Sequence, residues 1–341
     1  MKKLRKNIIF LILLVCFGCN KDIQIVESKI PLLKNHIVSV DTLLSIGAAI
    51  DIAQNDSYVF GNICGIDIDS LGNIYVLDTG YYFVKIYTNK GEFLNRVELQ
   101  EGDESGKFVK PQNIAAFNDG SFVIIDLMKR SYLQFGSNGE FKKEVNLGMM
   151  PMQLEVIGTS TAYVSGFELS YTGPLIHKYV DGVRIKAFCD RANGWEQIAR
   201  SGNTGRIVID DSGRVYYSYY LPYEIKVFDQ NENCRMIIRR RLGGLANPKI
   251  SEDGMTYVGV SGIRGLAIWR KTKIVCLVET IDKGCIMDIF AANGSLLVEI
   301  PAHKFGIENF RKIAIDHEGN IWMDNPSPYP HIIKFKLNIP Y

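Results

Sequence analysis

Apolar and polar residues alternate with a period of two in many short segments of the chain, as they do in half-buried β-strands. The alternation is clear over residues 65–69 and again over residues 73–77. Between these segments stands the sequence Asp-Ser-Leu-Gly, which predicts a tight turn because Gly72 can take a positive φ without strain. The pattern therefore predicts short antiparallel hairpins and an all-β fold.

The hairpin is part of a longer repeat. Residues 65–93 match residues 113–141 at an offset of 48 positions without a gap, and this aligns Asp78 with Asp126. A degraded copy covers residues 163–182. Three further turn glycines are each followed, after fifteen or sixteen positions, by an aromatic residue expected in a third strand: Gly213 with Phe228, Gly254 with Trp269, and Gly319 with Phe335.

Repeats of this kind predict a six-bladed β-propeller of four-stranded antiparallel blades. One such sheet cannot bury both of its faces, whereas a ring of sheets can and leaves only short edges. We expect the propeller to span residues 37–341, with a strand from residues 36–52 closing the ring against the last blade. Seven blades are the alternative, because residues 289–298 resemble another hairpin. Only 25 residues separate Gly294 from Gly319, which is too few for a whole blade.

The N-terminus has the pattern of a bacterial lipoprotein signal. Four basic residues stand in the first six positions, and an uncharged apolar run follows over residues 8–17. This run is too short to span a membrane. It ends at Gly18 and Cys19, which resemble a lipobox, where the cysteine carries a thioether-linked diacylglycerol. We expect removal of residues 1–18, lipidation of Cys19 and a tether over residues 19–36; an N-terminal anchor helix is the alternative.

The net charge of the chain does not favour binding to nucleic acid. The chain has 39 basic and 37 acidic residues, and removal of residues 1–18 takes away four basic ones, which leaves 35 against 37, a net charge of −2. The dense basic segment over residues 235–241 falls where an outer strand is expected, so we interpret it as a solvated edge. Five cysteines remain beyond Cys19, and none of them has Cys-x-x-Cys spacing, which argues against a metal site and against a disulfide framework. A single disulfide is the alternative that the sequence still allows.

The repeat is similar to a known propeller motif. The sequence Asp-x-x-Gly-Asn-Ile-Tyr-Val over residues 69–76, followed by Tyr87 and Gly91, resembles the NHL-type repeat. Together with the lipobox, residues 37–341 resemble the six-bladed propeller lipoproteins of Bacteroidetes. The resemblance implies the fold and a location in the cell envelope, with lipid anchoring to the outer membrane on its periplasmic or surface side. It implies no particular chemistry.

The loops after the second strand of each blade are rich in tyrosine and arginine. In a propeller these loops gather on one face around the channel mouth, and concave sites of this kind commonly bind ligands. Tyrosine and arginine supply large contact areas with polar groups. Packing between the blades is the alternative role. The candidate ligand-binding residues are Tyr81, Tyr82, Arg130, Tyr132, Tyr219, Tyr220, Tyr223, Arg264 and Tyr329.

The sequence contains no familiar catalytic motif. A Gly-x-Ser-x-Gly elbow, His-Glu-x-x-His, a phosphate-binding glycine loop and an EF-hand loop are all absent. We therefore expect a non-enzymatic binding module without catalytic residues, bound metal or cofactor. Its partners would be the membrane, through the lipid anchor, and a glycan, a peptide or an envelope protein. A scaffold subunit of an envelope complex is one alternative.

A hydrolase or lyase acting in the channel is the other alternative, because related six-bladed propellers include metal-dependent lactonases and lyases. The ligands of a divalent metal would then be acids at the ends of inner strands. Asp67, Asp78, Asp126 and Asp324 are the residues that could lie there. Asp78 and Asp126 also recur with the blade, which favours a structural role in capping a turn.

Overall fold

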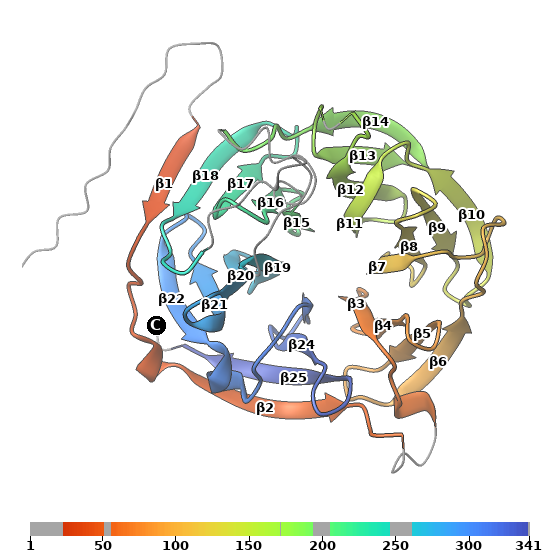
Figure 1. Ribbon diagram of the computed structural model, residues 1–341, viewed down its shortest axis with the longest axis horizontal. Coiled ribbons are helices and arrows are strands. Elements are labelled where there is room, and N and C mark those ends of the chain that lie inside the picture. Colours follow the sequence, from red (N-terminus) through yellow and green to blue (C-terminus); the bar gives the residue numbers. More distant parts are fainter. Residues whose placement is uncertain (1–22, 51–55, 171, 194–204, 246–260, 340–341) are drawn as a thin grey trace, which may run out of the picture.

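The structure is a ring of six β-sheets around one axis (Figure 1). Each sheet contains a blade of four antiparallel strands, and one sheet has β1 as a fifth strand; consecutive blades follow one another in the sequence, except that blade 6 takes its outer strand from the N-terminal part of the chain. This architecture is the six-bladed β-propeller that the repeat predicts. The computed structural model describes residues 23–50, 56–170, 172–193, 205–245 and 261–339.

The first strand of each blade lies next to the axis and the fourth lies at the outer rim (Figure 1). Blade 1 contains β3 (Ile63–Ile68), β4 (Ile74–Asp78), β5 (Phe83–Tyr87) and β6 (Phe93–Glu98). Blade 2 contains β7 (Pro111–Ala116), β8 (Phe122–Asp126), β9 (Ser131–Phe135) and β10 (Phe141–Asn146). Blade 3 contains β11 (Met150–Ile157), β12 (Thr161–Phe167), β13 (Ile176–Val180) and β14 (Val183–Phe188).

Blades 4 to 6 keep this order. Blade 4 contains β15 (Gly205–Ile209), β16 (Val215–Tyr219), β17 (Glu224–Phe228) and β18 (Cys234–Arg240). Blade 5 contains β19 (Gly262–Trp269), β20 (Lys273–Thr280), β21 (Gly284–Phe290) and β22 (Leu296–Pro301). Blade 6 contains β23 (Ile313–Ile315), β24 (Ile321–Asn325), β25 (His331–Asn338) and, as its outermost strand, β2 (Ser39–Ile46).

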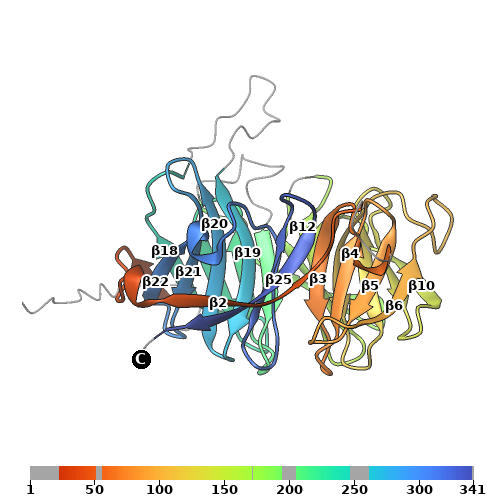
Figure 2. The same cartoon turned by 90° about the horizontal axis from the view of Figure 1, so that it is seen from below.

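The ring has two faces that differ in their connections, and the strands run between them (Figure 2). The turn face is the face at which the first strand of each blade turns into the second. The loop face is the opposite one, at which the second strand is joined to the third. Short 3-10 helices occur at η1 (Asn35–Ile37), η2 (Asp56–Tyr58) and η3 (Ala302–Phe305). In the described part of the chain, no helix has the length and apolar character that a membrane crossing requires.

An N-terminal segment wraps the rim of half of the ring (Figure 1). β1 (Gln24–Ser28) pairs in parallel with β18 of blade 4. The backbone N–H groups of Leu32 and Leu33 then donate to carbonyl oxygens of β22 in blade 5 at 3.1 and 2.8 Å. β2 pairs antiparallel with β25 and completes blade 6. Residues 24–46 are named the belt; its first part lies within residues 19–36, where the sequence suggests a free tether, and edge pairing holds it on the rim instead.

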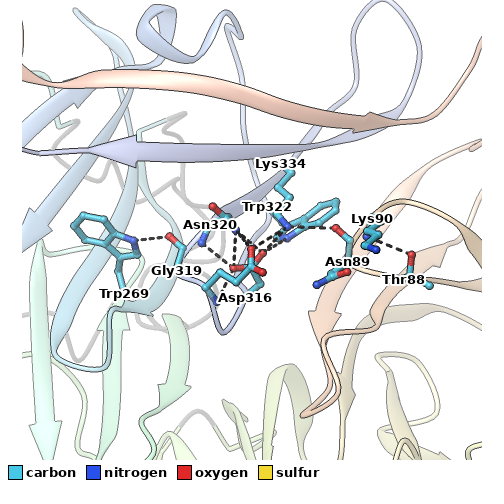
Figure 3. Close-up of polar contacts among 10 residues, drawn as sticks. Thr88, Asn89, Lys90, Trp269, Asp316, Gly319, Asn320, Trp322 and Lys334 are labelled. Atoms are coloured by element: carbon cyan, nitrogen blue, oxygen red, sulfur yellow. Dashed lines mark hydrogen bonds and ion pairs between the residues drawn. The ribbon is translucent and has the colours of Figure 1, made fainter.

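The aspartate of the repeated turn explains why the motif recurs (Figure 3). In blade 6 the Asp316 carboxylate accepts hydrogen bonds from the backbone and side-chain N–H groups of Asn320 at 2.8–3.1 Å and from Trp322 Nε1 at 3.3 Å. Lys334 Nζ lies 3.1 Å from the same carboxylate. The turn, the asparagine and the aromatic residue therefore form one hydrogen-bonded unit. The equivalent carboxylates are Asp69 in blade 1 and Asp210 in blade 4.

A second recurring aspartate closes the loop face of blades 1 and 2. The Asp78 carboxylate accepts hydrogen bonds from the backbone N–H groups of residues 61, 62 and 80 at 2.9–3.1 Å. The Asp126 carboxylate accepts four such bonds, from residues 109, 110, 128 and 129. Both side chains are fully buried. The structural role predicted for this recurring pair is confirmed.

Blade 5 departs from the predicted repeat. Trp269 ends the innermost strand rather than lying in a third strand, and the turn after it is made by Arg270 and Lys271, with φ of 48° and 66°. The alignment was wrong here because it relied on turn glycines, and this turn has none. Gly254, the expected turn residue, lies outside the described residues. Residues 289–298 fall in the hairpin of β21 and β22, the third and fourth strands of the same blade, so the count is six blades.

The basic outer strand β18 is not the solvated edge that its sequence suggests. β1 covers its outer edge. Arg240 is buried, and its guanidinium forms ion pairs with Asp288 and Glu299 of blade 5. The Tyr223 hydroxyl donates to Asp288 Oδ2 at 2.6 Å. The interpretation was wrong for Arg240, because carboxylates of the next blade replace water as its partners.

Candidate functional site

Each innermost strand brings one half-buried side chain to the axis near the loop face. In four blades this residue is the extra residue of a β-bulge, at which the pairing with the second strand skips one position. A bulge re-aims the side chain of the extra residue, and each of these side chains keeps partial contact with solvent. The bulge residues are Cys64, Gln112, Met152 and Arg264 on blades 1, 2, 3 and 5.

Two further residues occupy comparable places on the blades without such a bulge. Arg206 is the second residue of β15 in blade 4, and Lys312 directly precedes β23 in blade 6. Both are half-buried. These two residues and the four bulge residues are named the axial residues. They are neutral on blades 1 to 3 and cationic on blades 4 to 6.

The three cations form a connected group. Arg206 Nε donates a 2.6 Å hydrogen bond to the carbonyl oxygen of Arg264, which joins blade 4 to the innermost strand of blade 5. Arg264 Nε donates to Glu279 Oε2 at 2.7 Å, and the Arg264 guanidinium lies 5.1 Å from the centre of the Tyr220 ring. The Tyr220 ring can approach because Gly262 lacks a side chain; a Cβ there would lie 2.7 Å from the ring. Arg264 is thereby held in a fixed orientation.

Within the part of the ring that the structure describes, Lys312 is the axial cation whose side chain has no hydrogen-bond or ion-pair partner. Its backbone N–H donates to Asp324 Oδ1 at 2.7 Å, which fixes the start of β23. Its side chain lies deep inside the ring, and its ammonium group forms no hydrogen bond or ion pair with any other described residue. Burial, followed by the positive charge of Arg206, lowers the pKa of Lys312 to about 8. The amine is therefore mostly charged at neutral pH and loses its proton as the pH rises through about 8.

Two carboxyl groups lie further from the loop face, on the other half of the ring. Burial raises the pKa of Asp67 on β3 to about 6. Burial, and then the charge of Asp67, raises the pKa of Glu155 on β11 well above its usual range. Asp67 Oδ2 accepts a 2.7 Å hydrogen bond from the backbone N–H of Ala116 on β7, which orients it against the neighbouring blade. The interior of the ring thus has cations on one side and proton-binding carboxyls on the other.

Six of the nine predicted binding residues keep contact with solvent. Two of them, Tyr220 and Arg264, are brought together by the ring contact described above. Arg264 lies on the innermost strand β19 and not in a loop after a second strand, because the repeat of blade 5 was misaligned. Tyr329 packs against His331 with ring centres 5.2 Å apart. The six residues are Tyr81, Tyr82, Arg130, Tyr220, Arg264 and Tyr329.

The other three predicted residues, Tyr132, Tyr219 and Tyr223, are buried. The ring of Tyr132 packs edge-on against Tyr179 with centres 6.1 Å apart. The hydroxyl of Tyr219 donates to the carbonyl oxygen of Asp190. These tyrosines have the packing role that was the alternative, because the hydroxyls of Tyr219 and Tyr223 and the ring of Tyr132 find their partners inside the structure. They present no surface to a ligand in this structure.

Sequence reasoning missed Arg206 and Lys312, although a signal was present. Each stands four positions before the aspartate of the repeated turn, Asp210 and Asp316 respectively. Positions that share a place in the repeat share a place on the innermost strand. A comparison of this one position across the repeats would have picked out a cation in two of the six blades.

The described residues do not supply a metal site for the lactonase-like alternative. No three His, Cys, Asp or Glu side chains among them lie together in a group that could hold a metal ion. Asp78 and Asp126 are occupied by backbone N–H groups, and the Asp324 carboxylate accepts from Arg311 and Lys312 at 2.9 and 2.7 Å. The five described cysteines are free thiols.

A separate hollow of about 600 Å³ lies on the surface between the outer parts of blades 2 and 3. Asn146, Glu168, Tyr179 and Arg184 are among the residues that line it. Its one lining cation, Arg184, lies 3.8 Å from Glu168. The hollow is lined by none of the axial residues and by none of the predicted binding residues, so it is a weaker candidate for a binding site than the group of axial residues.

No protein-family model and no curated protein matches the sequence. Solved structures share its fold over most of the chain. A protein of Bacteroides fragilis described as exported superposes with a TM-score of 0.66 at 11% identity, covering 93% of this chain and 100% of the other. A member of the DUF4221 family from Bacteroides vulgatus gives 0.58 at 9% identity, covering 89% and 99%. A gluconolactonase of Xanthomonas campestris gives 0.55 at 11% identity, covering 87% and 99%. At these identities the likeness concerns the six-bladed propeller fold alone.

Proposed function

We propose that this protein is a lipid-anchored envelope module that binds an anionic ligand at the loop face, on the side of blades 4 to 6. The observation that carries the proposal is Lys312, whose ammonium group has no hydrogen-bond or ion-pair partner among the described residues and lies within reach of the charge of Arg206, which in turn is bonded to the carbonyl oxygen of Arg264. A half-buried cation is costly unless a group of opposite charge compensates it. Glu279 and Asp324 interact with this group, but the axial cations and the adjacent Arg311 outnumber them. An anion is the complement of this site.

The neighbouring side chains favour an acidic oligosaccharide as the ligand. Arginine donors suit a carboxylate or sulfate, because the guanidinium fork matches two oxygens at once. Tyr220 and Tyr81 at the loop face offer aromatic surfaces with a polar end, against which the apolar face of a sugar ring can pack. The carboxylate would sit by Lys312, and the sugar rings would extend over the tyrosines.

The test is a binding titration with a defined probe. Fluorescently labelled trigalacturonate is titrated with the purified protein, and its anisotropy is compared with that of labelled maltotriose, a neutral sugar. We expect only the acidic sugar to bind, and Lys312→Gln to weaken it about tenfold. Lys110→Gln is the matched control, because Lys110 also precedes an innermost strand but lies exposed on blade 2. Equal loss in both variants, or equal binding of both sugars, would contradict the proposal.

The envelope location rests on different support. The N-terminal pattern that ends at Cys19 lies outside the described residues, and a protein of the same fold is described as exported. Growth of producing cells with radiolabelled palmitate is the test. We expect the label to be incorporated into the protein and lost in the Cys19→Ala variant, which should also leave the membrane fraction. Unlabelled wild-type protein would remove the anchor from the proposal.

A channel-sited hydrolase is the second candidate, favoured by one observation. An amine with a pKa lowered to about 8 and a carboxyl with a pKa raised to about 6, Lys312 and Asp67, are typical of acid–base catalysts. A gluconolactonase shares the fold. The test is to incubate the protein with glucono-lactone and to measure whether hydrolysis is faster than the spontaneous rate. Lys312→Gln should abolish any turnover that belongs to the axial site.

A further inference from the structure

The belt, together with Ile23 directly before it, carries an unusual concentration of exposed apolar side chains. Among the described residues, eighteen large apolar side chains are exposed, and five of them fall between positions 23 and 37. Exposed apolar groups scattered singly are ordinary, whereas a cluster marks an interaction surface. These five residues, named the rim patch, are Ile23, Ile25, Ile30, Leu32 and Ile37.

The rim patch is not needed to hold the belt in place. Val26 packs against the core between blades 4 and 5, and Leu33 packs against the core between blades 5 and 6. The Ser28 hydroxyl donates to the carbonyl oxygen of Gly294 at 2.9 Å and accepts from the backbone N–H of Leu296 at 3.2 Å. Inward side chains and backbone pairing thus fix the belt, and the outward apolar side chains are left for another contact.

The belt begins a short distance along the chain from the proposed lipid site. Gln24, the first residue of β1, stands five positions after Cys19, and a fully extended chain over five positions spans at most about 18 Å. A lipidated Cys19 would therefore keep the rim of blades 4 and 5 close to the membrane surface. No other part of the ring is so constrained by sequence distance.

The charges around the rim patch suit anionic lipid headgroups. Lys29 and Lys34 are exposed within the belt. Arg241, directly after the adjacent β18, has a 77% exposed side chain and lies 3.8 Å from the carboxylate of Glu27 in β1, so the three cations outnumber this one acid. Basic residues beside apolar ones are typical of segments that lie in a membrane interface, where the apolar groups enter the headgroup region and the cations meet anionic lipids.

We propose that the rim patch of the belt lies on the membrane surface and fixes how the ring stands on it. The inference rests on the proposed lipid anchoring and adds a second, non-covalent contact to it. β1 pairs with β18 from Gln24 opposite Met236 to Ser28 opposite Arg240, so it enters from the turn face and runs toward the loop face. The lipid would attach on the turn-face side, and the loop face with its axial cations would stay open to ligand.

Vesicle binding of the unlipidated protein tests the inference. The mature chain carrying Cys19→Ser is sedimented with vesicles of phosphatidylethanolamine and phosphatidylglycerol at a ratio of about three to one. We expect measurable binding, and at least a fivefold lower partition coefficient in the double variant Ile30→Ser and Leu32→Ser. These side chains are 81% and 62% exposed, so the substitutions remove no core packing.

The matched control replaces two equally exposed apolar residues elsewhere. Leu71 and Val183, on blades 1 and 3, are 80% and 65% exposed, and the double variant Leu71→Ser and Val183→Ser should bind vesicles as well as the parent does. Equal losses in both double variants, or no binding by the Cys19→Ser chain, would overturn the inference. Palmitate labelling of the wild type reports on the anchor separately, so failure of the rim patch is distinguishable from failure of the lipoprotein proposal.

A depth measurement sharpens the same test. A tryptophan introduced by Ile30→Trp should be quenched by brominated lipids, whereas one introduced by Leu71→Trp should not. The native tryptophans are Trp195, Trp269 and Trp322, of which the last two are fully buried, and the parent chain measured in the same vesicles gives the background to be subtracted. Quenching at both positions would indicate non-specific adsorption and contradict the proposed orientation.

Discussion

The two halves of the ring end their sheets in different ways. In blades 4 to 6 the belt covers or forms the outer edge, through β1 on β18, residues 32 and 33 on β22, and β2 on β25. In blades 1 to 3 the outermost strands β6, β10 and β14 each pair with a single strand among the described residues. The same halves differ at the axis, where blades 4 to 6 contribute cations and blades 1 to 3 contribute neutral side chains.

The difference in the rim follows from the sequences of the outer strands. β10 reads Phe-Lys-Lys-Glu-Val-Asn and β14 reads Val-Arg-Ile-Lys-Ala-Phe, and charges on an edge discourage pairing with another chain. β22 reads Leu-Leu-Val-Glu-Ile-Pro, and an uncovered edge of that composition would be prone to aggregate. Blades 1 to 3 therefore leave charged edges unpaired among the described residues, whereas in blades 4 to 6 the belt covers the apolar edge of β22 and also the basic edge of β18.

Among the predicted changes, removal of Arg240 should have the largest effect, a loss of stability in blades 4 to 6, the half of the ring that the belt covers. Arg240→Ala leaves the fully buried Asp288 and its neighbour Glu299 without their cation, and loss of one member of a buried ion pair typically costs about 3–5 kcal/mol of unfolding free energy. Urea unfolding is the measurement. Arg241→Ala is the control, because that side chain is exposed and should change stability by less than about 1 kcal/mol. Similar values for both variants would mean that the cluster is not buried in solution.

The belt itself can be loosened without touching the axis. Val26→Pro removes a backbone N–H from β1 and should weaken its pairing with β18. Hydrogen exchange measured by mass spectrometry should then show peptides of β18 exchanging about tenfold faster, while peptides of β14 keep their rate. Faster exchange in both strands would indicate a global loss of stability and would break the comparison between the halves.

The sequence predicted those features of the fold that depend on local turn chemistry. The turn around Gly72 and the recurring Asp78 identified the blade, because each requires only nearby residues. The pairing of β1 with β18 could not be predicted, since it joins Gln24 to Met236 across most of the chain in a parallel arrangement. The alternation within β1 is compatible with any exposed edge.

The axial site was harder to predict than the fold for a related reason. A bulge at Arg264 depends on how one strand pairs with the next, and the sequence of β19 alone does not reveal it. The turn at Arg270 and Lys271 hid the start of blade 5, so Arg264 was assigned to a loop. The burial of Tyr219 and Tyr223 depends on the neighbouring blades, which a reading of single loops does not contain.

The pH dependence of binding would sharpen the contrast at the axis. If the anion meets Lys312, affinity for trigalacturonate should fall as pH rises from 7 to 9, because the pKa of Lys312 is about 8 and about a tenth of the amines remain protonated at pH 9. The loss should approach tenfold. Lys312→Arg keeps its charge throughout this range and should flatten the profile. An unchanged slope in that variant would assign the pH dependence to another group.

The smallest expected effect concerns the neutral half, where Asp67 can be replaced by its isosteric amide. Burial raises the pKa of Asp67 to about 6 from an ordinary value near 3.8, so the folded protein holds this proton more tightly than the unfolded chain does. Stability should therefore fall as pH rises from about 4 to 6, and the cost should persist above that window. Asp67→Asn removes the charge, and its side-chain oxygen can still accept from the backbone N–H of Ala116.

We expect Asp67→Asn to raise the unfolding free energy by about 1–2 kcal/mol at pH 8 and to leave it nearly unchanged at pH 4. Urea unfolding at the two pH values measures the difference. Asp41→Asn, an exposed substitution on β2, should change little at either pH. A gain of equal size at both pH values would mean that improved packing, and not the removed charge, stabilises the variant. A gain confined to high pH would identify blades 1 to 3 as the half whose interior disfavours charge, opposite the half that gathers cations.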